Sequence, residues 1–190
     1  MEYKILHLGA DLRESINYQD TAVPLLICTS RFDDYFQSEW PCHWHNEFEF
    51  AVVVRGRAKY IIYDGAEVLC EQELCEGDGI FISAGTFHSA MALAPDTIVS
   101  DAAFPITFFD MKPFDSCCKQ NIHPIIDSGI SHIALYKNNK ENAPVLSAIN
   151  ELCRLEKSEI GYDIPLRSAH NVAESVYNWL QAPRDLGYNW

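Results

Sequence analysis

Side chains of the kind that bind divalent metals gather in two short stretches of the sequence. The first stretch places His43, His45, Glu47 and Glu49 at alternate positions, and the second ends in His88. Imidazole nitrogens and carboxylate oxygens suit a borderline ion such as zinc, iron, nickel or manganese, because these ions accept mixed N/O ligands. The sequence therefore predicts a divalent-metal site made by His43, His45, Glu49 and His88.

The same side chains also fit a polar pocket that holds no metal. Imidazoles and a carboxylate inside a cavity can hydrogen-bond to one another or to a sugar-like ligand. Both interpretations bring the same side chains into one pocket, and the sequence leaves the choice between them open.

Strand periodicity is the feature that would align these residues. In an extended chain, successive side chains point to opposite faces, so His43, His45, Glu47 and Glu49 would share one face. The other face, formed by the even-numbered residues from Phe48 to Val54, is entirely apolar. We therefore expect both faces of this strand to be covered, as in a β-sandwich or a small barrel.

Short apolar runs closed by Gly, Pro or Asp predict the other strands. Arg57 and Lys59 mark the exposed face of one strand, which places Tyr60 inside and makes it a candidate pocket residue. Many short strands with regular turns are typical of an all-β barrel or sandwich. The predicted strands span residues 22–29, 47–54, 57–63, 66–70, 79–83, 87–93, 97–101 and 103–109.

The pattern changes to helical periodicity after Pro113. Apolar residues spaced for a helix predict one helix over 144–156 and a second over 163–181, which together form a helical hairpin. The second helix has an apolar arc wider than packing on the barrel requires, because Val172, Val176 and Trp179 flank its main stripe. We expect a homodimer through these C-terminal helices, since two-fold pairing would bury that arc. The alternative is that the arc packs on the helix at 144–156.

Composition narrows the partners and the compartment. The net charge is −13, with 27 acidic and 14 basic residues, which argues against a nucleic-acid surface on this chain. Seven cysteines without a Cys-x-x-Cys pair fit a reducing compartment better than a disulfide framework. No apolar run has the length of a signal peptide or a membrane span, so we expect a cytoplasmic protein that does not bind membranes.

The first stretch has the spacing of a known motif. His43, His45, Glu49 and Gly56 match the first cupin motif, which is His-x-His, three residues, Glu, six residues, Gly. The chain thus resembles the cupins, and the resemblance implies a jelly-roll barrel, also called a double-stranded β-helix, with these histidines and this glutamate as metal ligands.

The second stretch matches the second cupin motif less completely. Gly77, Gly85 and His88 stand at the positions of its glycines and its histidine. Ser83 replaces the usual proline, and Ala92 replaces the usual asparagine.

A narrower resemblance is to the N-terminal effector-binding domain of AraC-family transcription regulators. It is strong over residues 38–92 and weaker over 140–182, where the segment from Gly161 to Ser168 is similar to the helical part of that family. The resemblance implies two parts: a barrel with an N-terminal arm over 1–112, and a helical, dimerising extension over 113–190. The chain stops where that family begins its helix-turn-helix domain, so we expect no direct DNA reading by these residues.

This resemblance implies an effector-sensing domain that binds a small polar metabolite, such as a sugar, inside the barrel. Tyr35, Phe36 and Trp40 belong to a segment that can close the barrel in that family, and they are candidate ligand contacts or plugs of the barrel end. The complete set of predicted ligand-binding residues is His43, His45, Glu47, Glu49, Tyr60, His88 and Trp40.

The main rival is a stand-alone metal-dependent cupin enzyme of the dioxygenase or isomerase type. An open coordination position on the metal could activate oxygen or polarise a carbonyl group. Glu47 would be its general base, because it is predicted to share a face with His45. The regulator is the favoured interpretation, so a catalytic role is the less expected of the two.

Overall fold

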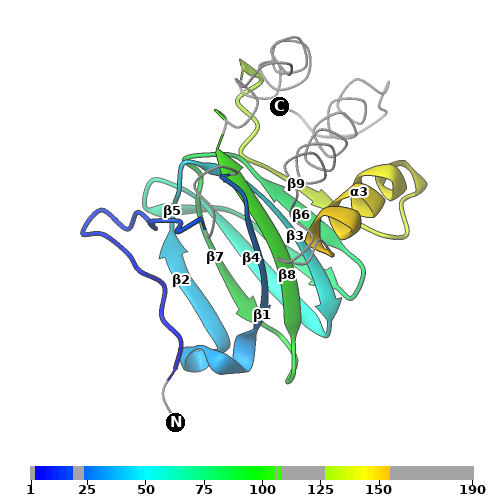
Figure 1. Cartoon of the computed structure of the whole chain (residues 1–190), viewed down its shortest axis with the longest axis horizontal. Coiled ribbons are helices and arrows are strands. Elements are labelled where there is room, and N and C mark those ends of the chain that lie inside the picture. Colours follow the sequence, from blue (N-terminus) through cyan, green and yellow to red (C-terminus); the bar gives the residue numbers. More distant parts are fainter. Residues whose placement is uncertain (1–2, 19–23, 106, 108–126, 155–190) are drawn as a thin grey trace.

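The computed structural model describes residues 3–18, 24–105, 107 and 127–154, and within these ranges the fold is mainly β (Figure 1). Two antiparallel sheets contain the strands, with orders β1-β8-β3-β6-β9 and β2-β7-β4-β5. The predicted mainly β architecture is confirmed. The strands of the described part are β1 (Leu26–Arg31), β2 (Glu39–His43), β3 (Glu47–Arg55), β4 (Arg57–Asp64), β5 (Glu67–Cys75), β6 (Gly79–Ile82), β7 (Phe87–Ala92), β8 (Ile98–Pro105) and β9 (His132–Leu135).

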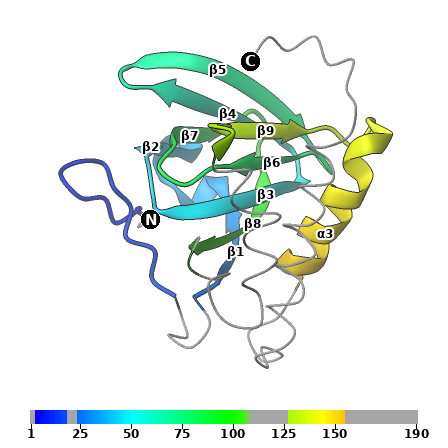
Figure 2. The same ribbon diagram turned by 90° about the horizontal axis from the view of Figure 1, so that it is seen from above.

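Strand β3 is the central strand of the larger sheet, and both of its faces are buried from Glu47 to Val53. On its outer face, Phe48 and Phe50 pack with Phe81 and Phe104, at ring-centroid distances of 5.0–6.4 Å. The helix α3 (Ala143–Cys153) lies against this sheet and contacts β3 and β8 (Figure 2). The expectation that both faces would be covered is confirmed.

The inner faces of the two sheets share one apolar core. Burial of these side chains is the main force that holds the sheets together, at roughly 25 cal/mol per Å² of apolar surface removed from water. The buried members of this core are Phe32, Trp40, Ala51, Val53, Ala58, Tyr60, Ile62, Leu74, Ile80, Ile82, Ala90 and Val99.

Strand β4 follows the predicted alternation. Ala58, Tyr60 and Ile62 are fully buried in the core, while Arg57 is exposed. Gly65, in the turn that joins β4 to β5, has a φ of 61°, as the Asp-Gly hairpin signal predicts.

Several strands differ from the prediction, and β1 begins and ends later than the strand expected at 22–29. The strands expected at 97–101 and 103–109 are one strand, β8, because it pairs with β1 and β3 without interruption at residue 102. The strand expected at 66–70 continues to Cys75, since β4 pairs with it over that whole length. Strands β2 and β9 were not predicted. Strand β9 adds to the edge of the larger sheet beside β6.

The helical elements are few in the described part. Short 3-10 turns occur at η1 (Phe32–Asp34), η2 (Phe36–Ser38) and η5 (Lys140–Asn142). Helix α3 confirms the helix expected at 144–156 to within a few residues. The second helix of the predicted hairpin, over 163–181, lies outside the described residues, and the predicted extension over 113–190 contains strand β9 as well as α3.

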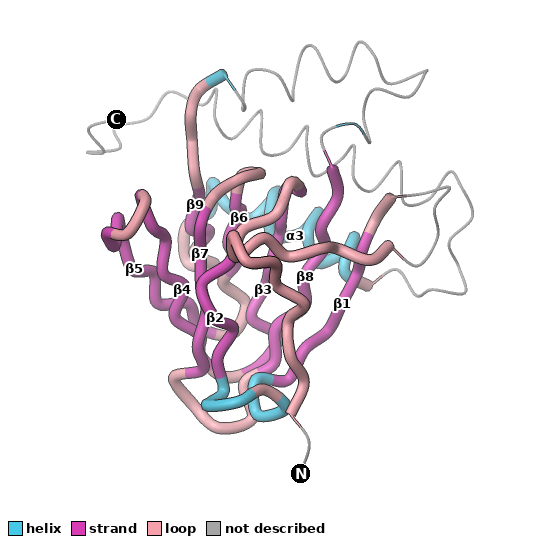
Figure 3. The backbone as a smooth tube through the Cα atoms, turned by 90° about the vertical axis from the view of Figure 1, so that its left-hand side faces the viewer, coloured by secondary structure: helices cyan, strands magenta, loops and turns pink. Residues whose placement is uncertain are grey.

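The N-terminal arm, residues 3–18, runs between the edge strands β1 and β2 of the two sheets (Figure 3). It forms isolated bridges to Tyr35 and Trp44. In the ranges that the structure describes, no helix is both long and apolar enough to cross a membrane.

Candidate metal centre and adjoining cavity

The four predicted metal ligands come together, although they do not share one strand. His43 ends β2, His45 lies in the connection after it, Glu49 is on β3 and His88 is on β7. The predicted extended run is therefore wrong at residues 44–46, because the chain crosses there from the smaller sheet to the larger one. Cross-strand pairing of His43 with His88 brings the two motifs together.

Each of the three histidines is oriented by a backbone carbonyl group. The Nδ1 atoms of His43, His45 and His88 lie 2.7, 3.1 and 2.9 Å from the carbonyl oxygens of Pro41, Glu47 and Thr86. A carbonyl oxygen only accepts, so each Nδ1 carries the proton and donates it. In a neutral ring, each Nε2 therefore presents a lone pair, which is the form that binds a metal.

The three imidazoles lie together, and two of them, His45 and His88, face the carboxylate of Glu49. Their ligand nitrogens lie within 4.8 Å of one another, and the three side chains are buried. Oε2 of Glu49 is 3.1 Å from Nε2 of His45 and 3.3 Å from Nε2 of His88. Lone pairs thus face lone pairs, an arrangement that needs a proton or a cation between them.

The pKa values of the site reflect this crowding. Burial, reinforced by the charge of His88, lowers the pKa of His43 to about 3, so its ring is neutral at pH 7. Burial also acts to lower the pKa of His45, but the hydrogen bond and charge of Glu49 outweigh it and raise that pKa. Burial opposes ionisation of Glu49, yet the hydrogen bond with His45 and the neighbouring imidazole of His88 hold its pKa well below the usual range. The electrostatics of the site thus favour a proton or a cation between His45 and Glu49.

The loop between β6 and β7 positions His88 against the other ligands. Gly85 has a φ of 77°, which only glycine adopts readily, and its N–H donates to the carbonyl oxygen of His45 at 2.7 Å. Ser83, at the position where the cupin motif has proline, donates its N–H to the carbonyl oxygen of Ser131 at 2.8 Å. The glycine of the motif therefore ties the second cluster directly to the first.

Glu47 does not belong to the converging group. Its Oε2 lies 3.8 Å from Nδ1 of His45, on the opposite side of the ring from Nε2, and its carboxylate accepts a hydrogen bond from Tyr18. It is also not among the residues that line the cavity. The crossing between the two sheets at residues 44–46 explains this placement. Because His45 and Glu47 no longer belong to one continuous strand, they do not share the face on which the predicted role of Glu47 depended.

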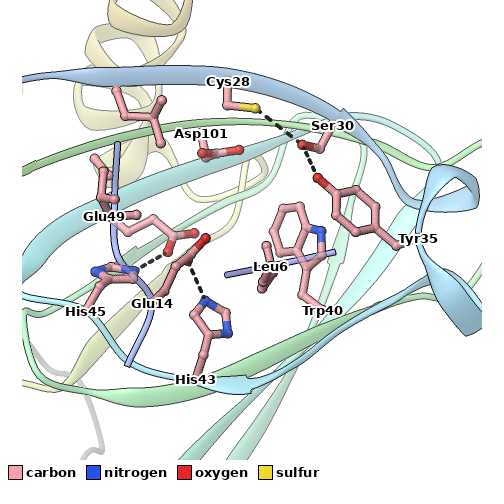
Figure 4. Close-up of a pocket in the computed structure, with 13 residues that line it drawn as sticks. Leu6, Glu14, Cys28, Ser30, Tyr35, Trp40, His43, His45, Glu49 and Asp101 are labelled. Carbon is pink, nitrogen blue, oxygen red and sulfur yellow. Dashed lines mark hydrogen bonds and ion pairs between the residues drawn. The ribbon is translucent and has the colours of Figure 1, made fainter. Parts of the chain in front are cut away.

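A cavity of about 130 Å³ adjoins the imidazoles (Figure 4). Glu14, Glu49 and Asp101 supply its carboxyl groups, and none of the described residues that line it is Lys or Arg. Burial, followed by the charges of Glu49 and Glu14, raises the pKa of Asp101 well above its ordinary value. The lining residues are Leu6, Glu14, Ile16, Leu26, Cys28, Ser30, Tyr35, Trp40, His43, His45, Glu49, Asp101 and Ala103.

Three buried polar atoms have no hydrogen-bond partner of acceptable geometry among the described residues: Trp40 Nε1, Tyr60 Oη and His88 Nε2. Trp40 lines the cavity, whereas Tyr60 is packed in the core and does not line it. Burial, then the charges of Glu49 and Asp101, raises the pKa of Tyr60 well above its ordinary value. Native proteins pair most buried polar groups, so the unpaired atoms of Trp40 and His88 at this site indicate a missing partner.

The aromatic segment before β2 divides between the cavity and the surface. Tyr35 and Trp40 line the cavity and contact each other edge to face, at a centroid distance of 5.9 Å. Phe36, predicted as a ligand contact, is 60% exposed and packs on Tyr3 instead.

The sequence did not point to Glu14 or Asp101 as site residues. Glu14 reaches the site from the N-terminal arm, and no motif or periodicity marks it. Asp101 faces the cavity because β8 pairs with β3, so that it lies beside Ala51. An acidic residue inside an apolar strand was the signal available for Asp101.

Comparisons with known proteins give partial matches. No family model matches the chain. An uncharacterized HTH-type transcriptional regulator, YdeC, of Bacillus subtilis (strain 168) is 28% identical over 83 residues, which are 44% of this chain and 27% of the regulator. The matching region therefore spans about a quarter of the length of that relative.

Solved structures match over similarly short regions. An oxalate decarboxylase from Bacillus subtilis has 26% identity and a TM-score of 0.33, over 35% of this chain and 18% of the enzyme. KdgF from a Halomonas species has 24% identity and a TM-score of 0.35, over 44% of this chain and 71% of that chain.

Proposed function

We propose that this chain contains a cupin-type sensor domain of an AraC-type transcription regulator, which binds a small, neutral, hydroxyl-rich metabolite beside a divalent metal. A sugar is the leading class of ligand. His43, His45, Glu49 and His88 hold the ion, which is zinc, nickel, iron or manganese. When bound, the ion would supply a coordination position for an oxygen of the ligand, and the cavity walls would orient the rest of it.

One observation carries the proposal: the ligand nitrogens of three buried imidazoles lie within 4.8 Å of one another and face carboxylates, next to a cavity. Backbone carbonyl groups fix all three rings in the metal-binding tautomer. His88 Nε2 lies 3.3 Å from Glu49 Oε2 and makes no hydrogen bond of acceptable geometry with the described residues. A divalent ion satisfies these acceptors together, which hydrogen bonds alone do not achieve.

The charge of the cavity favours a neutral ligand over an anionic one. Its described lining has three carboxyl groups, Glu14, Glu49 and Asp101, and no Lys or Arg. The lining offers a carboxylate or phosphate ligand no basic side chain, and its three carboxyl groups offset the charge of the proposed metal. Hydroxyl groups both donate and accept, so they suit carboxyl groups and the unpaired N–H of Trp40. The volume of about 130 Å³ restricts the ligand to a small molecule.

The role in regulation is supported by the match to an HTH-type transcriptional regulator over 83 residues. It is also supported by the resemblance of residues 38–92 to AraC-family sensor domains. In this role, binding in the cavity changes the affinity of an attached DNA-binding domain, and this chain contacts DNA only through that domain.

Dimerisation through the helix predicted over 163–181 is part of the same proposal. Sedimentation of the wild type and of a Val176→Glu, Trp179→Glu double variant tests it. The proposal predicts a dimer for the wild type and a folded monomer for the variant. A wild type that stays monomeric at high micromolar concentration contradicts it.

The ligand is tested by thermal shift with a panel of neutral sugars, polyols and matched carboxylic acids, with and without Mn²⁺. A ligand at a hundred times its dissociation constant stabilises the folded state by about 2.7 kcal/mol, which for a chain of this size raises Tm by roughly 5–10 °C. Asp101→Asn should reduce the shift, since it removes a cavity carboxyl group. Glu71→Gln, an equivalent change on the exposed edge strand β5, should leave it unchanged.

The panel separates the alternatives. A shift with neutral, hydroxyl-rich compounds that depends on Mn²⁺ supports the proposal. A shift with carboxylic acids alone contradicts the assigned ligand class. Consumption of a bound compound, followed by mass spectrometry, would show an enzyme of the dioxygenase or isomerase type and overturn the sensor role.

A further inference from the structure

The N-terminal arm places a carboxylate at the metal site. Its residues 8–14 form a small hairpin, closed by a bridge between Leu8 and Glu14, and this hairpin docks on Trp44. Glu14 N–H donates to the carbonyl oxygen of Trp44 at 2.8 Å, and the Trp44 indole N–H donates to that of Asp11 at 3.0 Å. The guanidinium of Arg13 lies 5.6 Å from the centre of the Trp44 ring. These contacts hold the backbone of Glu14 beside the first ligand cluster.

The carboxylate of Glu14 points at the one imidazole that Glu49 does not reach. Its Oε2 lies 3.5 Å from Nε2 of His43, and its side chain is 19% exposed. His43 donates from Nδ1 to Pro41, so Nε2 offers a lone pair to an oxygen that also only accepts. Within the described residues, no N–H or O–H group donates a hydrogen bond to this carboxylate. A largely buried acceptor without a donor costs free energy.

Each of the three imidazoles therefore directs its Nε2 atom at a carboxylate oxygen. Nε2 of His45 and of His88 faces Glu49, at 3.1 and 3.3 Å, and Nε2 of His43 faces Glu14, at 3.5 Å. Metal–nitrogen and metal–oxygen bonds of about 2.0–2.2 Å allow two ligands of one ion to lie up to about 4 Å apart. All three separations fall within that limit.

We propose that Glu14 is a fifth protein ligand of the metal, and that a bound ion thereby fastens the N-terminal arm to the barrel. This inference rests on the metal site proposed above. Leu6 and Ile16 of the same arm line the cavity, so an arm fastened through Glu14 keeps one wall of the cavity in place. Metal occupancy then governs both the coordination of a ligand and its access to the cavity.

The test compares the full-length wild type with Glu14→Gln and with Asp11→Asn. Asp11 lies on the same hairpin, and its carboxylate accepts from the N–H of Arg13 within the arm, so its variant loses the same charge away from the metal. Affinity for Mn²⁺, and separately for Ni²⁺, is measured by calorimetry on chelator-treated protein. Amide hydrogen exchange of residues 7–16 is followed with and without the metal.

The expected result for Glu14→Gln is a loss of metal affinity on the order of 10- to 100-fold, a loss typical even of residues that only support a metal ligand. Metal should slow exchange of the arm in the wild type and in Asp11→Asn, but not in Glu14→Gln. Unchanged affinity in Glu14→Gln, or arm exchange that ignores metal in the wild type, overturns the role of Glu14 alone. Failure of the wild type to bind either metal overturns the metal site itself.

Discussion

The space between the two sheets has two unlike halves. Toward β4, β5 and β6 it is filled by fully buried side chains, among them Tyr60, Ile62, Leu74 and Ile80. Toward β1, β2 and β8 it contains a cavity and the carboxyl groups of Glu49 and Asp101, and the arm supplies part of the wall. The filled half provides stability by burial, and the hollow half contains polar groups whose partners are not supplied by the described residues.

Unequal packing of this kind is what a binding site requires. A rigid, filled half fixes the strand register, so that His43, His88 and Glu49 are held in place before a ligand arrives. The hollow half leaves room and unpaired acceptors for that ligand.

The largest effect is expected in the filled half. Ile62→Ala removes a fully buried side chain from β4, and we expect the free energy of unfolding to fall by about 2–5 kcal/mol because a cavity remains. Urea unfolding of metal-free protein measures this loss. Ser30→Ala, a truncation in the cavity wall, should cost less than about 1.5 kcal/mol, since it removes one weakly bonded hydroxyl group. An equal loss of unfolding free energy in the two variants would contradict the distinction between a tightly packed half and a hollow half.

The next effect concerns pH and sharpens the description of the hollow half. The pKa of His45 is raised from 6.5 in the metal-free protein. At any pH below this raised pKa, a metal ion must therefore displace a proton from His45 in order to bind. We expect affinity for Mn²⁺ to fall by about tenfold per pH unit for each proton displaced as pH decreases through this region. Above the raised pKa the affinity should level off. An affinity that is constant from pH 8 to pH 5.5 would contradict the assignment of His45 as a ligand.

The smallest effect is expected in the loop that joins β6 to β7. Ser83→Pro restores the residue that the cupin motif has at this position, but it removes the N–H that donates to Ser131. The carbonyl oxygen of Ser131 keeps its bond from Thr86, so the cost should be about 0.5–1.5 kcal/mol. Urea unfolding tests this, and Ser83→Ala, which keeps the N–H, is the matched control. A proline variant more stable than the control would show that this hydrogen bond is unimportant.

The two halves were not equally accessible from the sequence. Part of the filled half follows local rules, since the alternation from Arg57 to Ile62 identified Ala58, Tyr60 and Ile62 as buried. The proximity of the candidate metal ligands could be predicted from the spacing of two motifs, because pairing of β2 with β7 unites them. The crossing between sheets at residues 44–46 was not predicted, because a change of sheet depends on packing elsewhere in the chain. This crossing places Glu47 away from the site.

The cavity wall was the least predictable part. Glu14 approaches His43 only because its hairpin docks on Trp44, a contact between residues 30 positions apart that no periodicity encodes. Asp101 depends likewise on the register of β8 against β3. The register between distant strands and the path of the N-terminal arm therefore determine which residues form the cavity wall, and the cupin motifs do not encode either.

The central claim is that His43, His45, Glu49 and His88 hold a divalent metal, and metal content measures it most directly. Wild-type protein and a His45→Ala, His88→Ala double variant are incubated with Mn²⁺, desalted and measured by inductively coupled plasma mass spectrometry, and circular dichroism checks that both are folded. We predict stoichiometric metal in the wild type and none in the folded variant. Unchanged metal content in the variant, or a wild type without metal, would contradict the claim.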